Sequence, residues 1–263
     1  MADWNPALYT RFEEERTRPA RDLLRRCEFP LDRPFEMLRI ADLGCGPGNS
    51  TALLAERFPG AAITGFDTSE AMLEAARARL PQCRFALGDI AAFEPDDPFD
   101  LVFSNAALQW VLGHRTLIPA LMRQVAPGGV FAAQIPDNLA DPSQVAMREI
   151  ALEPDFAPLL AGDVERREAI GTREDYYDWL SAAGRREVDV WTTIYNHPMA
   201  DAQAITDWFS STGLKPFIDP LPDDLSERFK ARYTQEMDRR YPVRADGRRL
   251  LAFPRLFMVA RKG

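Results

Sequence analysis

The sequence predicts an α/β fold with a seven-stranded, mostly parallel sheet and helices on both faces of that sheet. Runs with the periodicity of β-strands alternate with amphipathic helical runs, which implies parallel βαβ units with right-handed crossovers. In one helical run Met72, Leu73, Ala76 and Leu80 recur at helical spacing behind Ser69, a residue type that caps helices. A glycine-rich turn after the first strand is the third sign of this fold class.

The individual elements follow from hydrophobic periodicity and from the turn residues that bound each run. The expected strands are residues 37–43, 62–67, 83–87, 99–104, 130–135, 187–195 and 255–260. The expected helices of the core are residues 50–58, 70–80, 115–124 and 172–183. Frequent charges and the central Pro19 predict two short helices in the first 26 residues.

We expect a single domain over residues 1–263. Its parts are an N-terminal helical cap (1–30), a cofactor-binding core (31–135) and two insertions (136–170 and 199–250). The insertions are short for separate domains, so we interpret them as a helical lid over the core.

Composition and charge argue against several classes of partner. The net charge of −8 is unfavourable for nucleic acid binding. No apolar run approaches the roughly 18–20 residues of a membrane span, and the N-terminus lacks the apolar stretch of a signal peptide. The three cysteines and two histidines have no disulfide or metal-ligand spacing. We therefore expect a cytoplasmic protein without a metal, a membrane partner or a nucleic acid partner.

The glycine-rich turn contains Asp42, Gly44, Gly46 and Gly48 between the first strand and the next helix. Such glycines let the backbone turn tightly and approach a ligand at a helix N-terminus. A dinucleotide fingerprint would place its third glycine where Asn49 stands, which disfavours an NAD-dependent dehydrogenase. The pattern acid-x-Gly-x-Gly-x-Gly instead resembles motif I of the class I S-adenosyl-L-methionine (SAM)-dependent methyltransferases, which have a Rossmann-like fold.

Further motifs of this superfamily follow in order. The resemblance implies that Asp67 accepts bonds from the ribose hydroxyls, that Asp89 and Ile90 recognise adenine, and that the end of the fourth strand faces the methionine moiety. Taken singly, Asp67 would fit NAD as well, Asp89 would more readily be a capping or turn residue, and Trp110 could be a core residue. The residues that the resemblance assigns to SAM are Asp42, Gly44, Gly46, Gly48, Asn49, Asp67, Thr68, Met72, Asp89, Ile90, Ser104, Asn105 and Trp110.

The residues after the fourth strand indicate the class of methyl acceptor. Amine methyltransferases acting on DNA bases or glutamine carry Asn/Asp-Pro-Pro-aromatic there, whereas this chain has Ser104-Asn105-Ala-Ala. The paired glutamates of protein arginine methyltransferases are also not evident. A small-molecule acceptor is therefore the leading class.

The flanking segments narrow the resemblance. Residues 3–24, Asn105-Ala-Ala-Leu-Gln-Trp110 and Tyr241-Pro-Val-Arg-Ala-Asp-Gly247 resemble the bacterial trans-aconitate 2-methyltransferases. The resemblance covers essentially the whole chain. It implies methyl transfer from SAM to one carboxylate of trans-aconitate, which gives a monomethyl ester and S-adenosyl-L-homocysteine.

The residues are compatible with that chemistry, because an ionised carboxylate needs no general base to attack a methyl group. Arginine side chains bind carboxylates with paired charge-assisted hydrogen bonds. Residues 228–255 contain nine cationic and three acidic residues, and this basic segment could bind the acceptor or could be a solvated helix face. The candidate acceptor-binding residues are Tyr9, Arg11, Arg18, His114, Tyr195, His197, Arg244 and Arg255, with Arg244 the first choice.

Two other functions stay open at this point. One is a SAM-dependent methyltransferase for another small acid or for a hydroxyl acceptor, which would need a base such as His114 or His197. The other is a non-catalytic SAM-binding protein.

Overall fold

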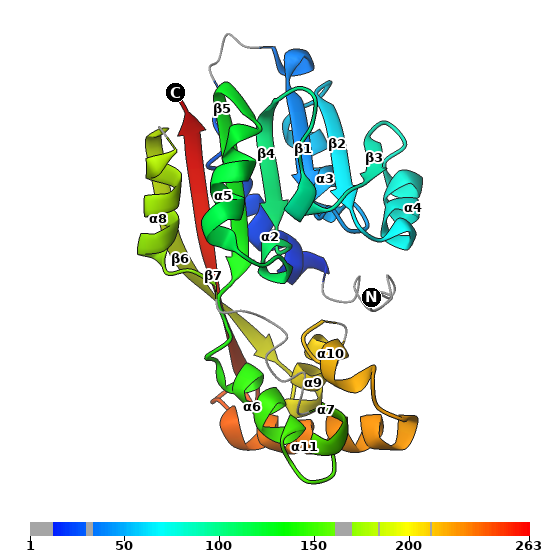
Figure 1. The fold of residues 1–263 in the computed structure, drawn as a ribbon. Coiled ribbons are helices and arrows are strands. Elements are labelled where there is room, and N and C mark those ends of the chain that lie inside the picture. The colour runs from blue at the N-terminus through cyan, green and yellow to red at the C-terminus, as the bar shows by residue number, and fades with distance from the viewer. Residues whose placement is uncertain (1–12, 30–33, 161–169, 184, 211) are drawn as a thin grey trace. The chain divides into compact units, whose positions relative to one another are not determined.

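The computed structural model describes the chain apart from residues 1–12, 30–33, 161–169, 184 and 211. Seven strands of the described residues form one sheet in the order β3-β2-β1-β4-β5-β7-β6 (Figure 1). The predicted fold class is confirmed. The strands are β1 (Arg39–Leu43), β2 (Ala62–Asp67), β3 (Arg84–Leu87), β4 (Phe99–Asn105), β5 (Val125–Pro136), β6 (Arg185–Met199) and β7 (Arg249–Lys262).

The first five strands of the sheet pair in parallel. Strand β1 pairs with β2 and β4, β2 pairs with β3, and β4 pairs with β5, whereas β7 runs antiparallel to β5. The order of strands reverses at β1, because β2 lies on one side of it and β4 on the other. Open α/β sheets bind ligands beside the carboxyl ends of the strands at such a reversal.

Helices cover both faces of the sheet. Figure 1 shows α5 in front of the sheet and α2 behind it, and each of these helices contacts β5. The helices and 3-10 turns around the sheet are α2 (Glu13–Leu24), η1 (Phe35–Met37), α3 (Asn49–Arg57), α4 (Glu70–Arg79), η2 (Ile90–Ala92), η3 (Leu108–Trp110), α5 (His114–Arg123) and α8 (Arg173–Ala182). The remaining described helices are α6 (Pro142–Ala151), α7 (Ala157–Leu160), α9 (Ala202–Ser210), α10 (Lys215–Ile218) and α11 (Asp223–Arg240).

Helix starts follow the local sequence. The Ser69 hydroxyl caps α4 by accepting a hydrogen bond from the Met72 N–H (3.4 Å), as predicted. Helix α8 begins with a capping box, in which Thr172 and Asp175 each bind the backbone N–H of the other. Such caps satisfy N–H groups that have no partner inside the helix.

The contacts divide the chain into two compact units. The sheet unit comprises Glu13–Pro136, Ile170–Thr193 and Arg255–Gly263, and the helical unit contains the described parts of Asp137–Ala169 and Ile194–Pro254. Each unit has its own cluster of buried apolar side chains. The sequence predicts one domain with two short insertions, but these insertions bury enough apolar surface against one another to form a second core. Their role as a lid stays a prediction.

Three strands are longer than the sequence predicts. Strand β5 begins at Val125, β6 extends to Met199 and β7 begins at Arg249. Pro254 lies within β7, and its carbonyl accepts a hydrogen bond from the Asp137 N–H (3.0 Å). Proline can occupy a strand where its missing N–H is not needed, so it does not end β7. Among the described helices, none is long and apolar enough to cross a membrane.

Candidate active site

The glycine-rich turn leaves β1 in a backbone conformation that favours glycine. Gly44, Gly46 and Gly48 have φ angles of 70°, 54° and 87°. The N–H groups of Gly44 and Cys45 both donate to the Phe66 carbonyl of β2, at 2.8 and 3.0 Å. Residues with a Cβ are strained in this left-handed region, so the three glycines allow the turn to fold back over the end of β2.

Two of these glycines have opposite surroundings. A Cβ added at Gly44 would lie 2.2 Å from the Cβ of Ala107 after β4 and 3.5 Å from Ile90 after β3. A Cβ added at Gly46 would meet no atom within 4 Å. The turn is therefore packed against two neighbouring loops at Gly44 and open at Gly46, where a ligand can approach the backbone closely.

Asp42 lies at the end of β1 and is fully buried. Its Oδ2 accepts hydrogen bonds from the Ser50 and Thr51 hydroxyls, both at 2.7 Å, and its buried Oδ1 has no partner among the described residues. Burial raises the pKa of Asp42 to about 6, although the bonds from Thr51 and Ser50 partly offset this, and the nearby charge of Asp67 adds to the rise. A buried carboxylate oxygen without a donor is a suitable partner for an ammonium group.

Asp67 ends β2 and faces the same turn. Its Oδ2 accepts a hydrogen bond from the Gly46 N–H (2.9 Å), and its Oδ1 accepts one from the Ser69 N–H (3.0 Å). Each carboxylate oxygen can accept two hydrogen bonds, so both oxygens can still accept a ligand hydroxyl. The carboxylate is held by backbone groups in a fixed orientation.

Six other residues assigned to SAM lie at the start of α3 or on the segments that follow β2, β3 and β4. Asp89 is exposed and caps η2 by accepting a hydrogen bond from the Ala91 N–H (2.9 Å), and Ile90 behind it is buried. The remaining residues are Met72, buried on α4; Thr68, exposed after β2; Asn49, whose Oδ1 accepts from Arg79 (2.7 Å); and Trp110, 42% exposed at the end of η3.

Three features of this arrangement fit SAM as a ligand. The partnerless Oδ1 of Asp42 can accept a bond from the methionyl ammonium, directly or through water. The open space at Gly46 can admit a ligand beside the backbone, and the Asp67 carboxylate can accept hydrogen bonds from ribose hydroxyls. In the described part of the chain, no group of three or more His, Cys, Asp or Glu residues could hold a metal ion.

The affinity for SAM is expected to increase with pH because of Asp42. Below about pH 6 the carboxyl is protonated in the free protein, and it must ionise to pair with the methionyl ammonium. The dissociation constant should therefore fall by up to about tenfold per pH unit below 6 and level off above 7. Calorimetric titrations between pH 5 and 8 measure this. Asp42→Asn should bind SAM weakly without this pH dependence, whereas an unchanged pH profile in that variant would assign the effect to another group.

The end of β4 carries a chain of polar side chains. The Ser104 hydroxyl donates to the Leu43 carbonyl of β1 (2.9 Å). The Oδ1 of Asn105 accepts a hydrogen bond from Gln134 Nε2 (2.8 Å), and Gln134 Oε1 accepts one from Arg255 Nη1 (3.2 Å). Gln134 is 0% exposed and Arg255 is 4% exposed. Arg255, a predicted acceptor-binding residue, is thus linked through Gln134 to Asn105, a residue that the resemblance assigns to SAM. The sequence did not indicate this link.

Two other acceptor-binding candidates of the sheet unit have different surroundings. His114 begins α5 and is buried; its Nδ1 contacts the Tyr176 hydroxyl (2.5 Å) and its Nε2 contacts the Leu108 carbonyl (2.9 Å). Since a carbonyl only accepts, Nε2 donates to it, and in the neutral ring Nδ1 accepts from the Tyr176 hydroxyl. Arg18 of α2 is exposed, with Nε 4.0 Å from Asp22. The candidates Tyr9 and Arg11 lie outside the described residues.

The last three candidates belong to the helical unit. Tyr195 and His197 are buried on β6, and the His197 ring packs against that of Trp208 with centroids 4.8 Å apart. Arg244 is exposed in the turn between α11 and β7, where its backbone N–H donates to the Arg248 carbonyl (2.7 Å). No ion pair involves the Arg244 side chain within the described residues.

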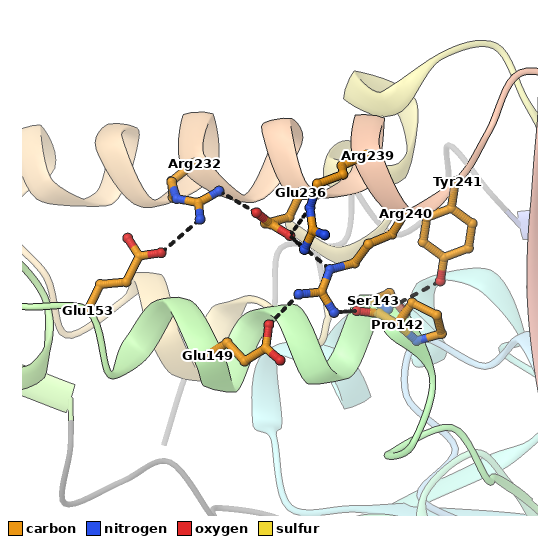
Figure 2. A network of polar contacts seen from close by, with 9 residues as sticks. All are labelled: Pro142, Ser143, Glu149, Glu153, Arg232, Glu236, Arg239, Arg240 and Tyr241. Atoms are coloured by element: carbon orange, nitrogen blue, oxygen red, sulfur yellow. Dashed lines mark hydrogen bonds and ion pairs between the residues drawn. The ribbon is translucent and has the colours of Figure 1, made fainter.

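Most of the basic segment forms ion pairs inside the helical unit. Figure 2 shows Glu236 of α11 bound by Arg232, Arg239 and Arg240. These bonds, with that of Arg239 the strongest influence, lower the pKa of Glu236 to about 2. Acidic residues from α6 and from the turn that follows it form ion pairs with the same segment. These pairs are Glu149 with Arg240, Glu153 with Arg232, and Asp155 with Arg228. These cations stabilise the packing of α11 on α6.

Comparisons with known proteins agree with this geometry. Residues 40–129 match a family described as "Methyltransferase domain". The chain is 55% identical to the trans-aconitate 2-methyltransferase of Variovorax paradoxus, over 100% of this chain and 99% of that protein. It is 54% identical to the trans-aconitate 2-methyltransferase of Paracidovorax citrulli, with the same coverage.

A solved structure shares the fold. The phosphoethanolamine N-methyltransferase 2 of Haemonchus contortus, solved in complex with SAM, superposes with a TM-score of 0.55 at 17% identity, covering 94% of this chain and 53% of that one. The sequence identity of 54–55% to these relatives, over the full length of both chains, establishes the family. The chain belongs to the family of the trans-aconitate 2-methyltransferases, which are SAM-dependent methyltransferases.

Proposed function

We propose that this SAM-dependent methyltransferase transfers a methyl group to one carboxylate of trans-aconitate, giving a monomethyl ester and S-adenosyl-L-homocysteine. Two relatives that are 54–55% identical over the whole chain are trans-aconitate 2-methyltransferases, which supports this acceptor. The single structural observation that carries the proposal is the buried guanidinium of Arg255 in the sheet unit, joined through Gln134 to Asn105 at the end of β4.

A buried guanidinium is a strong site for a carboxylate. Arginine has five N–H donors in a planar fork, and the one on Nη1 donates to Gln134 Oε1 (3.2 Å). Burial excludes water and strengthens the attraction between guanidinium and carboxylate. An acidic protein with a net charge of −8 needs such a local positive group to bind a tricarboxylate.

The chemistry requires orientation more than proton transfer. SAM supplies an electrophilic methyl group on a sulfonium, and the acceptor carboxylate is already an anion near neutral pH. The residues of the chain therefore bind and align the two reactants, and none has to remove a proton. His114 agrees with this, because its acceptor nitrogen is engaged by the Tyr176 hydroxyl and its donor nitrogen by the Leu108 carbonyl.

The proposal predicts a characteristic acceptor preference and pH profile. Trans-aconitate should be methylated faster than mono- and dicarboxylic acids at equal concentration, because fewer carboxylates leave part of the cationic site unpaired. The rate at saturating SAM should rise as the acceptor carboxylates ionise and then stay level to about pH 9, since arginine remains charged. Initial rates with a panel of acids, measured from pH 4 to 9, test both. A bell-shaped profile with an essential base near pH 7 would instead favour a hydroxyl acceptor.

A further inference from the structure

One buried amide, that of Gln134, joins Asn105 at the end of β4 to the buried guanidinium of Arg255. Gln134 of β5 lies directly opposite Asn105 of β4 in the parallel register. Its Nε2 donates to Asn105 Oδ1 (2.8 Å) and its Oε1 accepts from Arg255 Nη1 (3.2 Å). Its backbone carbonyl also accepts a hydrogen bond from the Ala106 N–H (3.0 Å). Gln134 therefore contacts the end of β4 at two consecutive residues and Arg255 at the same time.

The direction of these hydrogen bonds is fixed by the arginine. A guanidinium has donors only, so the atom of Gln134 that faces Arg255 must be the carbonyl oxygen. The NH2 group of Gln134 then faces Asn105 and must meet an acceptor, which is Oδ1. As a result, the Nδ2 of Asn105 is on the side of the amide away from Gln134. Among the described residues, no group accepts a hydrogen bond from this nitrogen.

The backbone after Asn105 is held in one conformation. Ala106 has a φ of 55° and is the only non-glycine residue with a positive φ in the described part of the chain. Its N–H is bound by the Gln134 carbonyl, and its own carbonyl accepts from Gln109 Nε2 (2.6 Å). Ala107 then packs against Gly44 of the glycine-rich turn. A strained residue kept in place by such contacts is typical of a functional position.

We propose that Gln134 is a positioning residue that makes the end of β4 selective for a carboxylate. It orients Asn105 so that the Nδ2 donors face the acceptor, and the Arg255 charge polarises the chain of amides and strengthens those donors. A carboxylate only accepts hydrogen bonds and matches this site, whereas a hydroxyl acceptor would need a group that takes its proton. This inference rests on the proposed carboxylate acceptor.

The variant Gln134→Glu reverses the direction of the hydrogen bond between residue 134 and Asn105, with almost no change in the shape of the side chain. A glutamate beside Arg255 is ionised and only accepts, so Asn105 must turn its Nδ2 inward and present Oδ1 to the acceptor. We expect the KM for trans-aconitate to rise about 10- to 150-fold. The dissociation constant for SAM should change less than about threefold, since Asp42, Gly46 and Asp67 are untouched. Gln134→Met, which removes the bonds without reversing them, should have a smaller effect on KM.

The matched control is Gln144→Glu, which makes the same change at a buried amide of α6 in the helical unit. It should lower the melting temperature and leave the KM for trans-aconitate as in the wild type. A folded Gln134→Glu with an unchanged KM overturns the inference, and so does a weakened affinity for SAM, which would mean that Asn105 binds the methionyl carboxylate. A wild-type enzyme that methylates no di- or tricarboxylic acid would refute the proposed function itself, and with it this inference.

Discussion

Gly46→Ala should lose most of its affinity for SAM while the protein still folds. The residue has a φ of 54°, and a Cβ there meets no protein atom within 4 Å. The left-handed conformation costs a residue with a Cβ about 1–2 kcal/mol of folding stability, which a domain of this size tolerates. The same methyl group would occupy the space through which SAM approaches the backbone. We expect a loss of about 1–3 kcal/mol in binding, or roughly 5- to 150-fold in affinity by calorimetry.

The control variant Gly128→Ala distinguishes the effect of backbone strain from the loss of a contact with SAM. Gly128 has a φ of 73° and also meets nothing within 4 Å, but it lies near the start of β5, at the opposite edge of the sheet from the carboxyl ends. It should lower the melting temperature about as much as Gly46→Ala and leave the affinity for SAM intact. Equal losses of affinity in the two variants would trace the effect to strain and remove Gly46 from the contact with SAM.

Arg255→Gln should reduce kcat/KM for trans-aconitate about 10- to 150-fold. The substitution removes the charge and the planar fork, and one charge-assisted pair contributes roughly 1.5–3 kcal/mol. Arg255→Lys should recover only part of the activity, because lysine restores the charge without the fork. Steady-state kinetics with varied trans-aconitate at saturating SAM measure the loss.

A second buried arginine of the same strand provides the control. Arg249 is 9% exposed and pairs with Asp238 and with the Tyr241 carbonyl inside the helical unit. Arg249→Gln should destabilise the protein, as the loss of a buried pair does, and leave kcat/KM unchanged below the melting temperature. If Arg255→Gln behaves in the same way, Arg255 has a structural role only and Arg244 becomes the leading acceptor-binding candidate.

The geometry of the glycine-rich turn was predictable because its determinants are local. The residues from Asp42 to Thr51 form the turn and the start of α3 in one short stretch, so their spacing alone carries the motif. The position of Asp67 follows from the parallel register of β1 and β2, which the alternation of strands and helices implies.

The acceptor side depends on contacts that no local pattern encodes. The contact between Gln134 and Asn105 joins side chains from two strands, and its geometry exists only once the register of β4 and β5 is known. The ion pairs of the basic segment could not be predicted for the same reason. Its net positive charge was counted within residues 228–255, whereas Glu149 and Glu153 pair with Arg240 and Arg232 from a distant part of the chain (Figure 2). Asp155 pairs with Arg228 in the same way.

The central claim is that a carboxylate receives the methyl group, and the stability of the product in base tests it most directly. The purified protein is incubated with trans-aconitate and SAM carrying a labelled methyl group, and the labelled product is then treated with mild alkali. A methyl ester hydrolyses, so the account predicts that all transferred label is recovered as volatile methanol. Label that stays on a non-volatile product after alkali would indicate an ether or N-methyl bond and contradict the account.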